Sequence, residues 1–237
     1  MNVCPHCQAK TNPLRLLLMT RRHKLTPMNN SLLLFDLDGT ISDPLEGIAR
    51  SFNYALSFYG HDEVPISDLS QYIGPPLDEC FKMITGIDEH IEINNFISKY
   101  RERYSDVGFS ENKLYPGIRE SITALSSQNV AMAICTSKRR DFAERILRLF
   151  GIRHHFRFVS GGDSGIQKWQ QIESLMDSGA IDDSCTMIGD RAVDLSAAHK
   201  NGIKSAGVLW GFGSRAELEA QSPICLLSQP SDLLILK

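Results

Sequence analysis

The sequence lacks several features that mark other classes of protein. Its 237 residues contain no apolar run close to the roughly 20 residues that cross a bilayer, so we expect no membrane span. Six cysteines are too few for a disulfide framework in a chain of this length, which indicates reduced thiols and a cytoplasmic protein. The 25 basic and 28 acidic residues give a net charge of −3, so we expect no nucleic-acid partner.

What is present is typical of a globular enzyme. Hydrophobic residues make up 42% and charged residues 22%, and the length suits either one large domain or one domain with a smaller companion. Residues 1–30 differ from the rest, because they hold five basic residues and no acidic one. We predict a basic N-terminal extension, either a disordered tail or translation from a start upstream of Met28. Cys4 and Cys7 form only half of a zinc-ribbon pattern, so we assign no zinc.

From residue 115 onward, short apolar runs alternate with helical patterns. This alternation predicts an α/β fold with a Rossmann-like parallel sheet and helices on both faces. The predicted strands are residues 31–35, 130–135, 156–159, 185–188 and, as the last major strand, 204–209. Residues 44–114 instead keep helical spacing and show no convincing strand. We therefore predict a core formed by residues 31–43 and 115–237, with residues 44–114 as a small helical cap.

Polar clusters follow three of the predicted strands. Ligands of open parallel sheets bind beyond the carboxyl ends of the strands, so these clusters mark the expected site. They are Asp36 with Asp38, Thr136 with Ser137 and Lys138, and Asp190 with Asp194. The helical insert follows the first of these strands and is expected to overhang the same edge.

The first cluster indicates acid–base or metal chemistry. Asp36 and Asp38 are two residues apart at a strand end, so their side chains point to the same side. Two such carboxylates repel each other unless a cation or a shared proton relieves them. Asp190 supplies a third oxygen donor, and a few carboxylates with waters and a substrate phosphate are how Mg²⁺ is usually held. On its own, the Asp-x-Asp pattern fits a solvated strand-end turn equally well.

The ordered set of motifs resembles the haloacid dehalogenase-like hydrolases. Residues 35–40 (FDLDGT) resemble the first motif of that family, and residues 130–136 resemble the second. Lys168 stands where the family has its lysine, and residues 188–194 (IGDRAVD) resemble the acidic fourth motif. The resemblance runs from about Leu32 to the C-terminus.

The resemblance implies a role for each of these residues. Asp36 is the expected nucleophile, and Asp38 is the expected general acid and base. Mg²⁺ would be held by the Asp36 carboxylate, the Asp38 backbone carbonyl and Asp190, with Asp194 ordering the ligands.

The phosphoryl oxygens are expected to be bound by the second motif and the lysine. Thr136 and Ser137 would donate hydrogen bonds to them, and Lys168 would offset their charge. Trp169 follows Lys168 where many relatives have proline, and Lys138 competes with Lys168 for the role. Further residues of the same motifs are expected to support the site: Gly39, Thr40 and Gly189.

The second aspartate favours phosphate-ester hydrolysis, because relatives that release halide lack an acid at the position of Asp38. Within the insert, residues 43–48, 72–77 and 114–118 resemble the phosphoglycolate phosphatase branch, some members of which are described as 5′-nucleotidases. The loop with Gly74 and Pro75 is expected to face the site and help to select the leaving group.

We therefore predict a Mg²⁺-dependent phosphatase that hydrolyses small phosphate monoesters, as a monomer or homodimer. Phosphoglycolate is the substrate that we predict first, and a nucleoside 5′-monophosphate is the alternative substrate. A sugar phosphomutase and a nucleic-acid-binding protein with a vestigial hydrolase core are the remaining alternatives.

Overall fold

The structure is a computed structural model that describes residues 31–162 and 165–237. The predictions made for residues 1–30, including those for Cys4, Cys7 and Met28, lie outside the described residues. Within the described part of the chain, no helix is both long and apolar enough to cross a membrane.

A six-stranded sheet forms the centre of the fold. Its strand order is β5-β4-β1-β6-β7-β8, and every neighbouring pair is parallel. The predicted α/β class is therefore confirmed. The strands are β1 (Leu33–Phe35), β4 (Met132–Arg139), β5 (Val159–Gly162), β6 (Thr186–Gly189), β7 (Lys204–Val208) and β8 (Cys225–Leu227).

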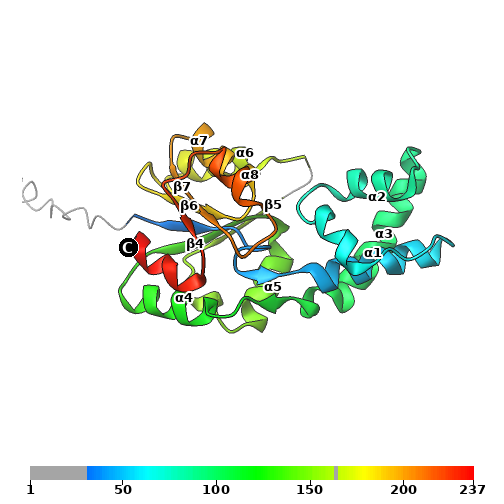
Figure 1. Ribbon diagram of the computed structural model, residues 1–237, viewed down its shortest axis with the longest axis horizontal. Coiled ribbons are helices and arrows are strands. Elements are labelled where there is room, and N and C mark those ends of the chain that lie inside the picture. The colour runs from blue at the N-terminus through cyan, green and yellow to red at the C-terminus, as the bar shows by residue number, and fades with distance from the viewer. Residues whose placement is uncertain (1–30, 163–164) are drawn as a thin grey trace, which may run out of the picture.

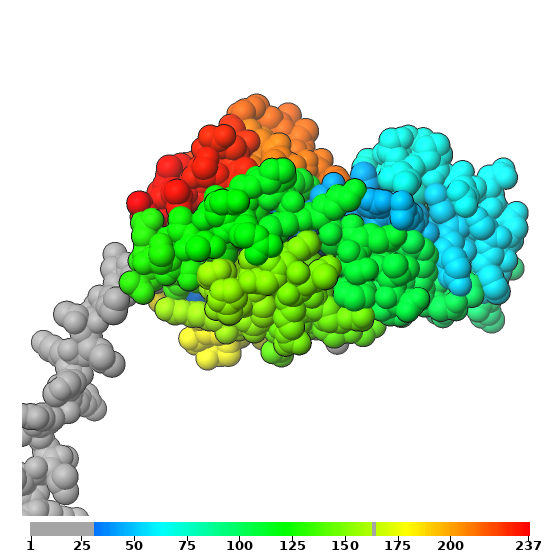
Figure 2. Space-filling view, turned by 90° about the horizontal axis from the view of Figure 1, so that it is seen from below, coloured from blue at the N-terminus to red at the C-terminus, as the bar shows by residue number. Residues whose placement is uncertain are grey.

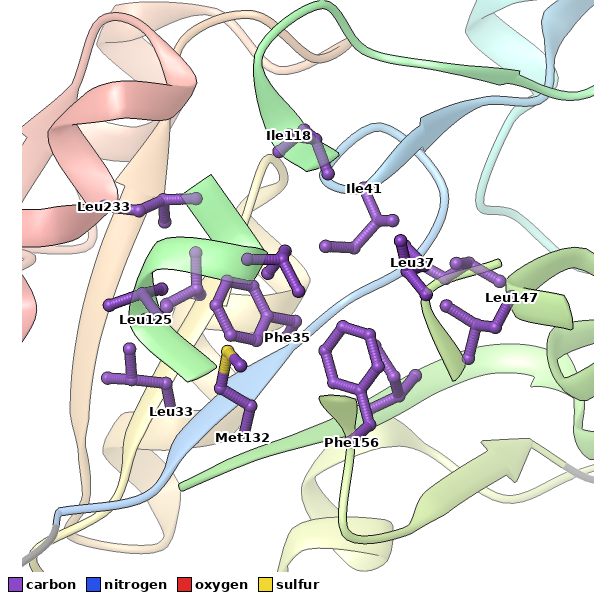
Figure 3. Close-up of a cluster of buried hydrophobic side chains, with 14 of the residues drawn as sticks. Leu33, Phe35, Leu37, Ile41, Ile118, Leu125, Met132, Leu147, Phe156 and Leu233 are labelled. Atoms are coloured by element: carbon purple, nitrogen blue, oxygen red, sulfur yellow. The ribbon is translucent and has the colours of Figure 1, made fainter. Parts of the chain in front are cut away.

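Helices cover both faces of the sheet, as Figure 1 shows. Alternate side chains of β1 enter two separate hydrophobic clusters, because successive residues of a strand point to opposite faces. Leu33 and Phe35 pack in the cluster of Figure 3, while Leu34 packs in the other. The first cluster lies under α4 (Ile118–Ser127), α5 (Arg140–Leu149) and the 3-10 helix η5 (Pro230–Leu236). The second lies under α6 (Lys168–Asp177) and α7 (Ala192–Lys200).

The segment between β1 and α4 is mostly helical and has a hydrophobic cluster of its own. It begins where Asp43 Oδ1 accepts a hydrogen bond of 2.9 Å from the Leu45 amide, at the start of the first helix. Figure 2 shows this insert in cyan at one end of the molecule. Its helices are α1 (Leu45–Phe58), η2 (Ile66–Tyr72), α2 (Leu77–Thr85), α3 (His90–Asp106) and η3 (Gly108–Glu111). Its cluster also takes in Phe142 of α5, which joins it to the core.

The strands of the sheet differ from the prediction in two places. The third predicted strand, 156–159, actually begins at Val159 and continues through the two glycines that were expected to open a loop. A Cβ atom on Gly161 would collide with the backbone of Arg140, so glycine lets this strand approach the start of α5. Residues 204–208 form β7, at the place predicted for the last major strand, and the short strand β8 follows it. The three residues of β8 are too few for a periodic signal.

A two-residue antiparallel pair was also missed. It is formed by β2 (Ser42–Asp43) and β3 (Lys113–Leu114), and it lies where the chain enters and leaves the insert. Segments of two residues carry no alternation that a sequence pattern can reveal.

Candidate active site

The polar residues at the carboxyl ends of β1, β4 and β6 meet at one edge of the sheet. These three strands are neighbours in the order β4-β1-β6, so their carboxyl ends lie together. The Asp36 amide donates to the carbonyl of Ile188 (2.9 Å), which ties the end of β1 to the end of β6. The sheet order therefore brings the two acidic motifs of the sequence into contact.

Three buried carboxylates form the centre of the site. One oxygen each from Asp36, Asp190 and Asp194 lies within 4.8 Å of the others. Asp190 accepts hydrogen bonds from the Thr40 hydroxyl (3.3 Å) and from the Phe212 amide (2.8 Å). Asp194 accepts from the Arg191 amide at 3.1 Å. These contacts fix the carboxylates in a water-poor position where their mutual repulsion is strong.

Lys168 lies against this acidic cluster. Its ammonium group is 3.0 Å from Asp36 Oδ1, and it also forms an ion pair with Asp194 Oδ1. The side chain is only 2% exposed, so Lys168 is a buried lysine and not one on a solvated helix face. Burial lowers the pKa of Lys168, but the adjacent Asp194 and Asp36 carboxylates outweigh burial and raise it above the ordinary value. The group therefore carries a positive charge at neutral pH.

The cluster contains more negative charge than Lys168 can balance. Burial, followed by repulsion from Asp194 and Asp36, raises the pKa of Asp190 to about 8. Burial also raises the pKa of Asp194 to about 6, despite the neighbouring Lys168. Asp36 Oδ1 is buried, and the Lys168 ammonium at 3.0 Å offsets part of its charge. Three carboxylates this close, with more negative charge than one lysine offsets, suit a divalent metal ion, since hard cations prefer oxygen ligands.

Glycines allow this cluster to pack closely. Gly39 has φ of +81°, a conformation that favours glycine, and a Cβ atom there would collide with the Asp190 carboxylate. A Cβ atom on Gly189 would meet Asp194, and one on Gly211 would meet Asp190. The predicted supporting residues Gly39, Thr40 and Gly189 therefore all contact the acidic cluster.

A second lysine serves the other aspartate of the first motif. Lys138 Nζ lies 2.8 Å from Asp38 Oδ2, so the two lysines that competed for one role in the sequence contact different carboxylates. Thr136 is buried and lines the cavity beside them, while Ser137 is exposed at the rim. The predicted phosphate-binding residues thus lie together with both aspartates.

The insert closes over this site. A cavity of about 50 Å³ lies between the acidic cluster and the loop that follows η2. Gly74 lines it, as predicted, but Pro75 does not. The Arg191 guanidinium donates to the Ile73 carbonyl of that loop (3.2 Å) and to Glu217 of α8 (Arg215–Glu219; 3.0 Å).

A larger hollow of about 640 Å³ lies on the insert and contains none of these residues. Two arginines line it, and both form ion pairs with Glu111: Arg50 at 2.8 Å and Arg103 at 2.9 Å. Their charges are already satisfied, so we place the site at the smaller, acidic cavity.

Several cavity residues were not identified from the sequence. Arg191 and Val193 lie inside the acidic fourth motif but are not among its expected acids. Phe212 lies in a glycine-rich stretch that is too weak to be a nucleotide motif. The stretch matters because the Phe212 amide donates a hydrogen bond to Asp190. The contact arises because β7, which precedes the stretch, lies next to β6, which precedes Asp190.

Comparison with known proteins agrees with this geometry. The family model described as "Haloacid dehalogenase-like hydrolase" matches residues 33–208, which include both the core and the insert. A protein of Pseudomonas aeruginosa named 5′-nucleotidase is 41% identical over 195 residues, covering 81% of this chain and 88% of the relative.

Two further relatives resemble the chain over most of its length. A phosphoglycolate phosphatase of Aquifex aeolicus is 28% identical over 207 residues, which cover 86% of this chain and 94% of the relative. The crystal structure of a predicted phosphatase from Clostridium acetobutylicum has a TM-score of 0.78 at 32% identity, covering 86% of this chain and 96% of the other. The chain belongs to the haloacid dehalogenase-like hydrolases and is an enzyme of their phosphatase group.

Proposed function

We propose that this protein is a Mg²⁺-dependent phosphatase that hydrolyses nucleoside 5′-monophosphates through a covalent aspartyl-phosphate. The observation that carries the mechanism is the contact of Lys168 with both Asp36 and Asp194 beside Asp190. This arrangement supplies a nucleophile, a positive charge and a metal-binding face within one small cavity.

Asp36 is the nucleophile in this mechanism. Its carboxylate attacks phosphorus and forms a new P–O bond, while the bond to the leaving oxygen breaks. Asp38 gives a proton to that oxygen, and in the second step it takes a proton from the water that attacks the aspartyl-phosphate. Lys168 offsets the charge on the transferring phosphoryl group, and Thr136 and Ser137 donate hydrogen bonds to its oxygens. Such electrostatic stabilisation dominates phosphoryl transfer.

The carboxylates of Asp36 and Asp190, with the Asp38 backbone carbonyl, would hold Mg²⁺. When bound, the metal neutralises charge on the phosphoryl oxygens and orients them. Asp194 would order these ligands, because it is tied to Lys168 and to the Arg191 amide. The close approach of the three buried carboxylate oxygens supports this assignment.

The comparisons favour the nucleotide over phosphoglycolate, the first substrate suggested by the sequence motifs. The nucleotidase relative is 41% identical and the phosphoglycolate phosphatase 28%, over similar lengths. A cavity of about 50 Å³ is well below the ~300–1,000 Å³ of typical ligand pockets, so a nucleoside requires the insert loop to move away. Phosphoglycolate stays the second candidate, because its small leaving group needs less movement.

Phosphate release from a panel of esters tests the proposal. The panel contains nucleoside 5′-monophosphates, phosphoglycolate and sugar phosphates, each with Mg²⁺ and with EDTA. We expect turnover that needs Mg²⁺, is fastest for a nucleoside 5′-monophosphate and is lost in Asp36→Asn. Faster turnover of phosphoglycolate would reverse the order of the two substrates. The proposed function would be contradicted if the folded protein hydrolysed none of the esters.

A further inference from the structure

Each aspartate of the first motif has its own buried lysine. Lys168 contacts Asp36 and Asp194, whereas Lys138 contacts Asp38 at 2.8 Å. The mechanism above uses Lys168 but leaves Lys138 without a role. Lys138 also donates a hydrogen bond of 2.7 Å to the Tyr104 hydroxyl, which belongs to α3 of the insert.

We propose that Lys138 and Tyr104 are positioning residues that hold the Asp38 carboxylate by its Oδ2 atom, so that Oδ1 exchanges the proton with the leaving oxygen. The proposal rests on the proposed function, because it assigns the means by which that reaction obtains its general acid. It also gives the insert a part in the chemistry, through a side chain of α3 that lies outside the cavity loop.

The two oxygens of Asp38 are in different environments. Oδ2 is engaged by the Lys138 ammonium, while Oδ1 is buried and has no hydrogen-bond partner among the described residues. Asp38 lines the cavity together with Asp36 and Thr136. An ammonium group has only donors, so it fixes Oδ2 as an acceptor and leaves Oδ1 to carry the proton.

The sheet directs Lys138 toward Asp38. The pairing of β4 with β5 shifts its register between Thr136 and Arg139, so Ser137 and Lys138 occupy an irregular stretch. Such irregularities re-aim side chains and are common beside active sites. The Lys138 side chain is 8% exposed, which leaves little freedom for another orientation.

Tyr104 is held rigidly between the insert and the core. Its ring stacks on Tyr100 of the same helix at a centroid distance of 5.6 Å and meets Phe142 of α5 edge-on at 5.1 Å. Beyond it, the Arg145 guanidinium donates to the Ser105 carbonyl (3.2 Å). The end of α3 is thus fixed to α5, and the Tyr104 hydroxyl lies at a defined position for Lys138.

The proton balance gives Lys138 a further effect. In the first step, the proton on Asp38 Oδ1 passes to the leaving oxygen as its bond to phosphorus breaks. The alcohol leaves neutral, and Asp38 becomes a carboxylate whose negative charge the Lys138 ammonium offsets. Protonation by Asp38 speeds the first step strongly when the leaving group is an alkoxide, which must be protonated. It has little effect when the leaving group is p-nitrophenolate, which leaves as an anion.

This difference between leaving groups is the test. We expect Lys138→Met to lower kcat/KM for a nucleoside 5′-monophosphate by about 100-fold, the usual contribution of a positioned general acid. The loss for p-nitrophenyl phosphate should stay below about 10-fold. Tyr104→Phe should show the same selectivity with a smaller loss, of about 10-fold on the nucleotide, because it removes one hydrogen bond to a charged group and leaves the contact of Lys138 with Asp38 in place.

A matched control comes from the neighbouring ring. Tyr100→Phe removes a hydroxyl from the ring that stacks on Tyr104 without touching the bond to Lys138, so both substrates should be hydrolysed as by the wild type. Circular dichroism checks that each variant is folded. When Lys138→Met is added to Asp38→Asn, kcat/KM for p-nitrophenyl phosphate should fall by less than about 3-fold further. Lys138 acts through Asp38 in this account, and the effects of residues that act as one unit are not additive.

Equal losses on both esters would show that Lys138 binds the phosphoryl group directly and would overturn the proposal. The proposal would also be overturned if Lys138→Met lowered kcat/KM as much in the Asp38→Asn protein as it does in the wild type. In both cases the wild type stays active, so the proposed function survives. Wild-type protein that hydrolyses neither ester refutes the proposed function itself.

Discussion

Lys168→Met gives a sharp test of the electrostatics of the acidic cluster. The substitution keeps the length of the side chain but removes the ammonium group that lies 3.0 Å from Asp36 and pairs with Asp194. Three buried carboxylates are then left without their cation. We expect loss of both stability and activity, for the same electrostatic reason.

The structure sets the size of the effect. At 3.0 Å and an effective dielectric constant of about 20, one ion pair is worth about 5 kcal/mol before desolvation is subtracted. Removing one partner of a buried pair typically costs about 3–5 kcal/mol, because the remaining charge stays buried. We expect the free energy of unfolding of metal-free protein to fall by about that amount, and phosphatase activity to be lost.

Denaturant unfolding in EDTA measures the loss. Lys82→Met is the matched control, because Lys82 pairs with Asp88 at an exposed position and its removal should leave the free energy of unfolding unchanged. Adding Asp194→Asn to Lys168→Met should recover part of the stability, since it removes one of the uncompensated charges. A Lys168→Met protein that unfolds within about 1 kcal/mol of the wild type would refute this account of the cluster.

The other predictions concern the metal ligands and the insert loop. Asp190→Asn should raise the Mg²⁺ concentration needed for half-maximal activity at least ~10-fold in a metal titration, because the metal would lose a charged ligand; an unchanged requirement would exclude Asp190 as a ligand. Gly39→Ala should cost at least about 1–2 kcal/mol in denaturant unfolding, because φ is +81° and the new methyl group would also collide with Asp190; wild-type stability would show that the turn adapts. Metal-free protein should become less stable as the pH rises from about 4 to 8. The pKa values of Asp190 (about 8) and Asp194 (about 6) lie above the ordinary 3.8, so the folded state binds more protons than the unfolded chain. Unfolding at several pH values should show this slope, and Asp190→Asn should flatten it; a slope of the opposite sign would contradict the raised pKa values. Arg191→Ala should change KM for the nucleotide more than kcat, because it removes the bond to the Ile73 carbonyl; steady-state kinetics in which only kcat falls would place Arg191 in the chemical step.

Much of the fold and site could be predicted from the sequence because the signals are local. The apolar run before Asp36 and the one before Asp190 predict strands whose ends carry acids, and the alternation with helices predicts that these ends share one edge. The order of the motifs then places Lys168 beside them, as the structure does.

The contacts that were missed are between segments far apart in the chain. The bond between Lys138 and Tyr104 joins residues 34 positions apart, and that between Phe212 and Asp190 spans 22. No local pattern encodes such a pair, since each depends on how the insert and the loop after β7 pack. The short strands β2, β3 and β8 were missed for a different reason, because two or three residues show no period.

The most direct test of the central claim is to trap the phosphoryl group on Asp36. Asp38→Asn should slow hydrolysis of the aspartyl-phosphate more than its formation from p-nitrophenyl phosphate, whose leaving group needs no proton. Acid quenching followed by borohydride reduction converts an acyl phosphate to an alcohol that peptide mass spectrometry locates. We predict the reduced residue at Asp36 and at no other position, only when Mg²⁺ and substrate are present. Turnover with the label on another residue, or with no label at all, would contradict the account.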